Sequence, residues 1–199
     1  MTELLPDVLR WTWFSEKFKY DFNGHLVRHA SGNLCIDPVE MSAEVLEELA
    51  REQPSRILLT NRNHFRAAER VRARTGARVA VHPADAAFVR EKGVTVDDEL
   101  AIGQHVGPFK IVAADGKSPG EVALYDAARK LLIVGDACVG NPPGACGLLP
   151  AAVMDAPETL KASLRRLATL DFDTLLVGDG EPILSGGRAA LQTLVSTFA

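Results

Sequence analysis

The chain has 199 residues, of which 47% are hydrophobic and 24% are charged, and its formal net charge is −4 at pH 7. A chain of this length can bury a substantial core, and the composition is that of an ordinary globular domain. The slightly acidic balance excludes a strong positive field, so we expect neither nucleic acid nor a membrane as a partner. The sequence contains no long apolar run and no secretory pattern at its start, which predicts a cytoplasmic protein.

The first part of the chain predicts a strand meander followed by a helix. Short segments rich in aromatic and branched residues, separated by turn signals, cover residues 9–14, 24–29 and 33–36. Ser42 is placed to cap a helix with an apolar face, and a further strand is expected over residues 57–60.

The rest of the chain alternates helices and strands. A helix that ends at Gly76 and a strand over residues 78–81 complete a βαβ unit. Further strands are expected over residues 107–114, 121–125, 130–134 and 174–177. The spacing of Asp155 and Glu158 predicts a capping box at the start of one helix, and a last helix points Leu191, Leu194 and Phe198 inward.

Two sheets with helices to cover them fit an αββα sandwich or a three-layer doubly wound sheet, and the loops between the elements separate these possibilities. Five motifs in order resemble the metallo-β-lactamase superfamily. They are the strand and acidic turn at 34–38, the strand end and polar loop at 58–66, the loop at 116–120, Val134-Gly135-Asp136, and the segment 177–183. The resemblance implies an α/β fold, a four-layer αββα sandwich, in a single domain over residues 1–199.

The same resemblance implies a hydrolase with one or two metal ions, usually zinc. Its seven ligand positions fall on Asn61, Asn63, Phe65, Arg66, Lys117, Asp136 and Asp179. Only Asp136 keeps the expected residue type. Zinc prefers imidazole, thiolate and carboxylate donors, whereas an arginine offers no acceptor and an amide oxygen is a poor donor. We therefore expect a degenerate site with no dinuclear zinc and no metal cofactor.

Replacement of the metal charge by side-chain charge gives a physical reason for the residues found at the ligand positions. Arg66 and Lys117 would supply the positive charge that metals supply elsewhere in the family, opposite Asp136 and Asp179. Asn61 and Asn63 would add the hydrogen bonds that buried charges require. We predict an ion-pair network in the vacated site. Plainer alternatives stay open: Asp136 satisfying a tight turn, and Lys117 exposed to solvent.

Three functions follow from this site. The first is a pseudoenzyme that binds a small anionic ligand or a protein partner. The second is a hydrolase with altered or metal-independent chemistry, in which Lys117 or His64 acts as acid or base and Arg62 or Arg66 holds an anion. The third is a structural subunit whose exposed aromatic residues, Trp11, Trp13 and Phe14, form a homo-oligomer interface.

Two further features have plain interpretations. The arginines between positions 62 and 78 suggest a solvated helix face rather than a nucleic-acid patch, because no aromatic platform is interleaved with them. The three cysteines, Cys35, Cys138 and Cys146, show no CxxC spacing, so free thiols are expected. A nucleophilic Cys138 beside His64 is an alternative without an identifiable orienting residue.

Overall fold

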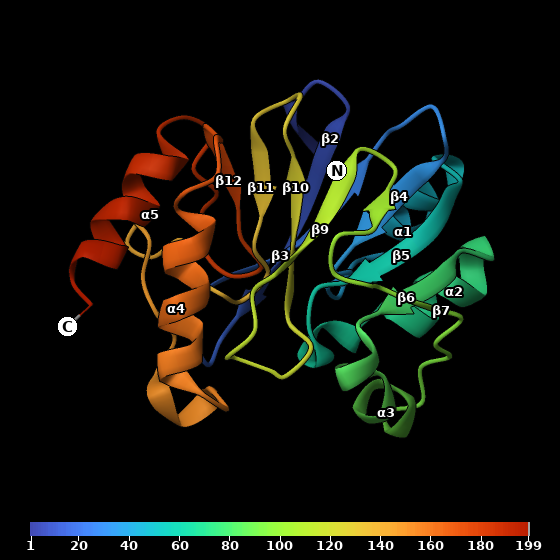
Figure 1. Cartoon of the computed structure of the whole chain (residues 1–199). Helices are drawn as coiled ribbons and strands as arrows, with labels where there is room; N and C mark the ends of the chain where they lie inside the picture. Colours follow the sequence, from blue (N-terminus) through green and yellow to red (C-terminus); the bar gives the residue numbers. More distant parts are fainter. Residues whose placement is uncertain (199) are drawn as a thin grey trace. The chain divides into compact units, whose positions relative to one another are not determined.

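The computed structural model describes residues 1–198, and the chain divides into two compact units, Met1–Ala101 and Ile102–Ala199. Each unit has its own β-sheet and its own helices (Figure 1). Within residues 1–198, no helix is both long enough and apolar enough to span a membrane. The expected single domain stays a prediction, and the two units are described separately below.

The sheet of the first unit has seven strands in chain order. They are β1 (Thr2–Leu5), β2 (Val8–Ser15), β3 (Tyr20–Val27), β4 (Asn33–Ile36), β5 (Pro54–Leu59), β6 (Arg78–Val81) and β7 (Asp98–Glu99). The first four strands pair antiparallel, and β4 to β7 pair in parallel. The carboxyl ends of β4, β5 and β6 therefore meet at one edge of the sheet, where the polar loops begin.

The helices of the first unit are α1 (Ala43–Arg51), α2 (Ala68–Thr75) and α3 (Pro83–Glu91), with a 3-10 turn, η1 (Arg62–Phe65), after β5. Their apolar residues share one core with the sheet, in which Leu49, Val71 and Val89 are fully buried. Ser42 caps α1 through the amide of Val45, as predicted, and Gly76 ends α2 in the left-handed conformation.

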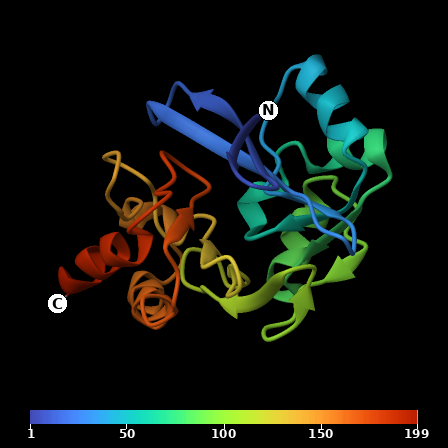
Figure 2. The ribbon, with the colours of Figure 1, turned by 90° about the horizontal axis from the view of Figure 1, so that it is seen from above.

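The second unit has a five-stranded sheet in the order β12-β11-β10-β9-β8. Its strands are β8 (His105–Val106), β9 (Phe109–Ala113), β10 (Val122–Asp126), β11 (Leu131–Ile133) and β12 (Thr174–Leu176). Helices α4 (Pro157–Leu167) and α5 (Gly187–Ser196) lie beside each other in this unit, in orange and red in Figure 2, and a short turn, η2 (Ala151–Val153), precedes α4. Leu191 is buried and Leu194 and Phe198 pack against the same core, as expected.

Two local predictions are wrong, and one helix was missed. The capping box is wrong, because α4 begins at Pro157, whose fixed φ suits the first helical position, and Ala156 gives no side-chain cap. Helix α3 was not predicted; it starts directly after His82, whose Nδ1 accepts a hydrogen bond from Ala84 N. Trp11 does not lie at a surface: it is buried, its ring covers Gly24, and its indole donates to the Val39 carbonyl.

Candidate functional site

The polar loop after β5 is held by its own hydrogen bonds. Asn61 is buried and its side-chain oxygen accepts from the amide of Asn63, which caps η1. Asp85 of α3 accepts from the amide of Arg62 at 2.8 Å and fixes the next residue of the loop. The two asparagines that match metal-ligand positions therefore lie in a local turn, and the Asn61 oxygen is already engaged in the cap.

A buried network of hydrogen bonds joins this loop to the end of β4. Asp37 follows β4 with a positive φ, and its carboxylate accepts from Thr60 N at 2.8 Å and from Thr60 Oγ1 at 2.7 Å. His64 Nδ1 lies 3.0 Å from both Thr60 Oγ1 and Asp37 Oδ2. All three side chains are at most 2% exposed. His64, a predicted acid or base, therefore links the ends of β4 and β5.

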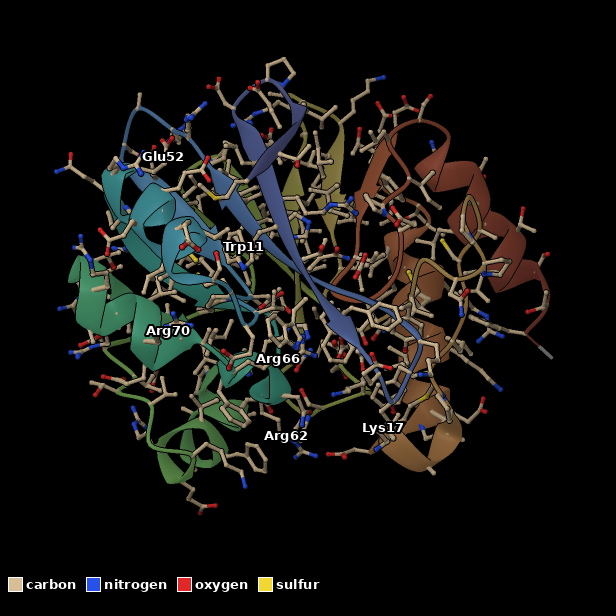
Figure 3. All side chains as sticks on the ribbon, turned by 180° about the vertical axis from the view of Figure 1, so that it is seen from behind. Trp11, Lys17, Glu52, Arg62, Arg66 and Arg70 are labelled. Carbon is tan, nitrogen blue, oxygen red and sulfur yellow. The ribbon has the colours of Figure 1, made fainter. Side chains whose placement is uncertain are left out.

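The two arginines of the loop stack on aromatic rings. The Arg66 guanidinium carbon lies 4.0 Å from the Phe22 ring centroid, and that of Arg62 lies 5.3 Å from the Phe88 centroid. Figure 3 labels both arginines on the segment that follows β5. Stacking holds the plane of a guanidinium while its N–H groups point sideways, a geometry suited to a planar anion.

His25 on β3 adds a buried titratable group that the sequence did not reveal. It is 1% exposed, and within residues 1–198 neither ring nitrogen has a hydrogen-bond partner. The pKa of His25 is lowered from 6.5 to about 4, mainly by burial; Asp37 opposes this shift, and the charges of Arg10 and His64 add to it. The imidazole is therefore neutral at physiological pH.

This shift predicts a loss of stability in mild acid. Because the unfolded state binds a proton at His25 more readily, the free energy of unfolding should fall as the pH falls from 6.5 toward 4. The loss from this one group should reach about 3 kcal/mol. Urea denaturation at pH 7, 5.5 and 4.5 measures the slope. His25→Gln should flatten it relative to the wild type, whereas His29→Gln, at a more exposed position, should not; equal slopes in all three proteins would contradict the assignment.

In the second unit the predicted ion pair is present. Lys117 Nζ lies 3.1 Å from Asp136 Oδ2, and the two side chains are only 7% and 4% exposed. The loop of Lys117 is fixed against the start of α4, since Gly116 O accepts from Ala156 N, and a Cβ on Gly116 would meet Leu160. The interpretation of Lys117 as a solvated surface residue is therefore wrong.

Two other loops of this unit are joined to the loop that carries Asp136. Glu121, which the sequence analysis missed, is 1% exposed and its Oε1 accepts from Asp136 N at 3.1 Å. Asp179 is buried in the loop after β12, and its carbonyl accepts from Gly140 N. A backbone bridge between Gly140 and Gly180 joins that loop to the segment after Asp136. The links predicted between these residues and Asn61, Asn63 or Arg66 stay a prediction.

The other arginines of the segment 62–78 lie in the first unit, and most of them form ion pairs with carboxylates. Arg72 contacts Asp97, Arg74 contacts Glu47 and Arg78 contacts Asp98. Arg70 donates to the Met41 carbonyl. These ion pairs neutralise the arginine charges at the surface of the first unit, in agreement with the solvated helix face expected from sequence.

The comparisons with known proteins agree on the family. The family described as the metallo-β-lactamase superfamily matches residues 2–198. The chain belongs to the metallo-β-lactamase superfamily. Its relatives include a hydroxyacylglutathione hydrolase of Acidiphilium cryptum, 31% identical over 83% of this chain and 66% of that protein. One from Rhodobacter capsulatus is 31% identical over 82% of this chain and 63% of that protein. The chain thus spans about two thirds of the length of these relatives.

Solved structures confirm the predicted superfamily fold. A metallo-β-lactamase from Pontibacter korlensis has a TM-score of 0.79 and 16% identity, with 99% of this chain and 98% of that chain covered. TTHA1623 in a di-iron-bound form has a TM-score of 0.71 and 25% identity, with 90% and 96% covered. Both matches cover nearly the whole of this chain and of the other chain, so the fold class inferred from the five motifs is correct.

These findings contradict the prediction of no metal cofactor. The matching family is described as the metallo-β-lactamase superfamily, and TTHA1623 was solved in a di-iron-bound form. The side chains of this chain nevertheless do not fit the usual donor set. Within residues 1–198 no three His, Cys, Asp or Glu side chains are grouped to share a metal, and Asp136 is paired with Lys117. The residue types at the seven ligand positions describe the side chains available for a metal. They do not establish that a superfamily member uses no metal.

Proposed function

We propose that this superfamily member has a degenerate dinuclear ligand set and binds a small anionic ligand through the arginines after β5. The observation that carries the first part is the Lys117–Asp136 ion pair, at 3.1 Å and almost wholly buried. An ammonium group at that distance repels a cation from the one carboxylate that keeps its family position. Metal hydrolysis of the usual dinuclear kind is not supported by such a pair.

The anion-binding part rests on Arg62 and Arg66. Each is half-buried and stacked on a phenylalanine, Phe88 or Phe22, so little side-chain freedom is lost when an anion binds. A guanidinium fork binds a carboxylate or phosphate bidentately. The neighbouring amide of Arg62 is already held by Asp85, which keeps the loop in place without a ligand.

Titration calorimetry with inorganic phosphate and with glutathione tests this proposal. We expect binding of at least one of the two, weakened about tenfold or more by Arg62→Met or Arg66→Met, since each removes a charge-assisted contact. Arg74→Met is the matched control, because Arg74 of α2 pairs with Glu47 of α1 at the surface, so its loss should not change binding. Failure of both probes to bind, or equal affinities in all variants, would contradict the proposal.

A second candidate function is hydrolysis of a thioester such as a hydroxyacylglutathione. The observation that favours it is the 31% identity to hydroxyacylglutathione hydrolases over 83% of this chain. Release of glutathione from a hydroxyacylglutathione, by protein incubated with zinc or iron, measures it. Turnover that a chelator and Asp136→Asn both abolish would select this function over the first.

A further inference from the structure

Two cysteines of the second unit meet across a small antiparallel bridge. Val139 and Gly147 exchange both backbone hydrogen bonds, at 2.9 and 2.8 Å. The residues just before them, Cys138 and Cys146, therefore point to the same side of the bridge, on a diagonal. Cys138 belongs to the apolar core of this unit, and Cys146 packs against that core, so the two side chains are neighbours.

The two thiols differ in their access to solvent. Cys138 is fully buried, whereas Cys146 is partly exposed. The hydrogen bond with Cys138 lowers the pKa of Cys146, although its partial burial acts in the opposite direction. The partly exposed thiol is the one that an external electrophile can reach first, and its buried neighbour then resolves the product. Cys35, fully buried in the first unit with its pKa raised by burial, belongs to no such pair.

We propose that Cys138 and Cys146 form a reversible dithiol–disulfide site that reacts with low-molecular-weight disulfides. The Cys146 sulfur attacks one sulfur of the small disulfide, forms a mixed disulfide and releases one thiol. The Cys138 sulfur then attacks the Cys146 sulfur, forms the intramolecular bond and releases the second thiol. The protein is oxidised by two electrons, and the small disulfide is reduced to two thiols, which take up the two protons.

The new bond would close the loop that carries Gly140. Gly140 N donates to Asp179 O, Glu181 N donates to Gly140 O, and a Cβ on Gly140 would clash with Glu181 O. The loop is therefore packed tightly against the segment that carries Asp179, while Cys138 lies two residues after Asp136. Oxidation would restrain the loop 138–146, which follows Asp136 and packs against the segment that carries Asp179.

Intact-mass spectrometry of the full chain after exposure to glutathione disulfide tests the site. In the wild type we expect two thiols to disappear, as counted by alkylation after unfolding, and no glutathione adduct to persist. Cys138→Ser should trap the adduct on Cys146, with Cys138→Ala as the alternative where serine disturbs the core. Cys146→Ser should react about tenfold more slowly or not at all. Cys35→Ser, the matched control, should behave like the wild type.

Two results would overturn the proposal: a persistent adduct in the wild type, and loss of thiols in Cys146→Ser at the wild-type rate. The melting temperature gives a second readout. Oxidised protein should melt roughly 5 °C above reduced protein, because the bond restricts the unfolded chain and joins two side chains that the folded bridge already holds on one side. A lower melting temperature after oxidation would show that the bond does not fit this bridge. Neither readout depends on the anion-binding arginines, so the proposed function is tested separately.

Discussion

Replacing Lys117 by methionine should lower the free energy of unfolding by about 3–5 kcal/mol, because Asp136 would stay buried without its cation. The two groups are 3.1 Å apart and almost fully shielded from water. A buried carboxylate that loses its partner must either unfold the site or take up a proton. Urea denaturation at pH 7, followed by circular dichroism, measures the loss.

The controls for this experiment separate burial from charge. Lys161→Met removes the ion pair between Lys161 and Glu158, which has a similar distance, 2.7 Å, but lies at the surface of α4. Its loss should lower the free energy of unfolding by less than about 1 kcal/mol. The double variant Lys117→Met with Asp136→Leu removes both charges and should recover most of the stability lost in the single variant. A loss below about 0.5 kcal/mol in Lys117→Met would show that the pair is not buried in solution.

Sequence patterns predicted the elements whose signals are local. Ser42 and Gly76 mark helix ends through their own chemistry, and the strand over residues 33–36 has its predicted bounds. The short strands β7 and β8 have no such signal, since each consists of two residues whose identity as a strand depends on a neighbour. Helix α3 escaped prediction because Pro83 suggested the end of a strand, whereas it also suits the first turn of a helix.

The candidate site divides in the same way. Charge complementarity within the family pattern predicted the Lys117–Asp136 pair, which joins residues from two loops. Glu121 and His25 were missed because nothing in their immediate sequence distinguishes a buried polar residue from an exposed one. Asp37 carried a signal, the acidic turn after residues 33–36, but its partners Thr60 and His64 lie more than twenty residues away along the chain. Such partners become visible only when parallel strands bring their carboxyl ends together.

The network around Asp37 leads to the second large prediction. Asp37→Ala should lower the free energy of unfolding by about 3–5 kcal/mol, because it leaves the amide and hydroxyl of Thr60 and the ring of His64 without their common acceptor. All of these groups are buried. Alanine also suits the positive φ at this position, 48°, less well than aspartate does. Chemical denaturation again gives the magnitude.

Two variants distinguish the contributions of charge and of hydrogen bonding in this network. Asp37→Asn keeps a side-chain oxygen for the Thr60 amide, and asparagine tolerates a positive φ, so it should cost clearly less than alanine. Thr60→Val removes only the hydroxyl and should cost about 1–2 kcal/mol. If Asp37→Ala and Thr60→Val destabilise equally, the carboxylate is not the centre of the network, and His64 is held by another group. If the predicted order holds, His64 is fixed by Asp37 as a structural link between β4 and β5, which argues against its use as a mobile acid or base.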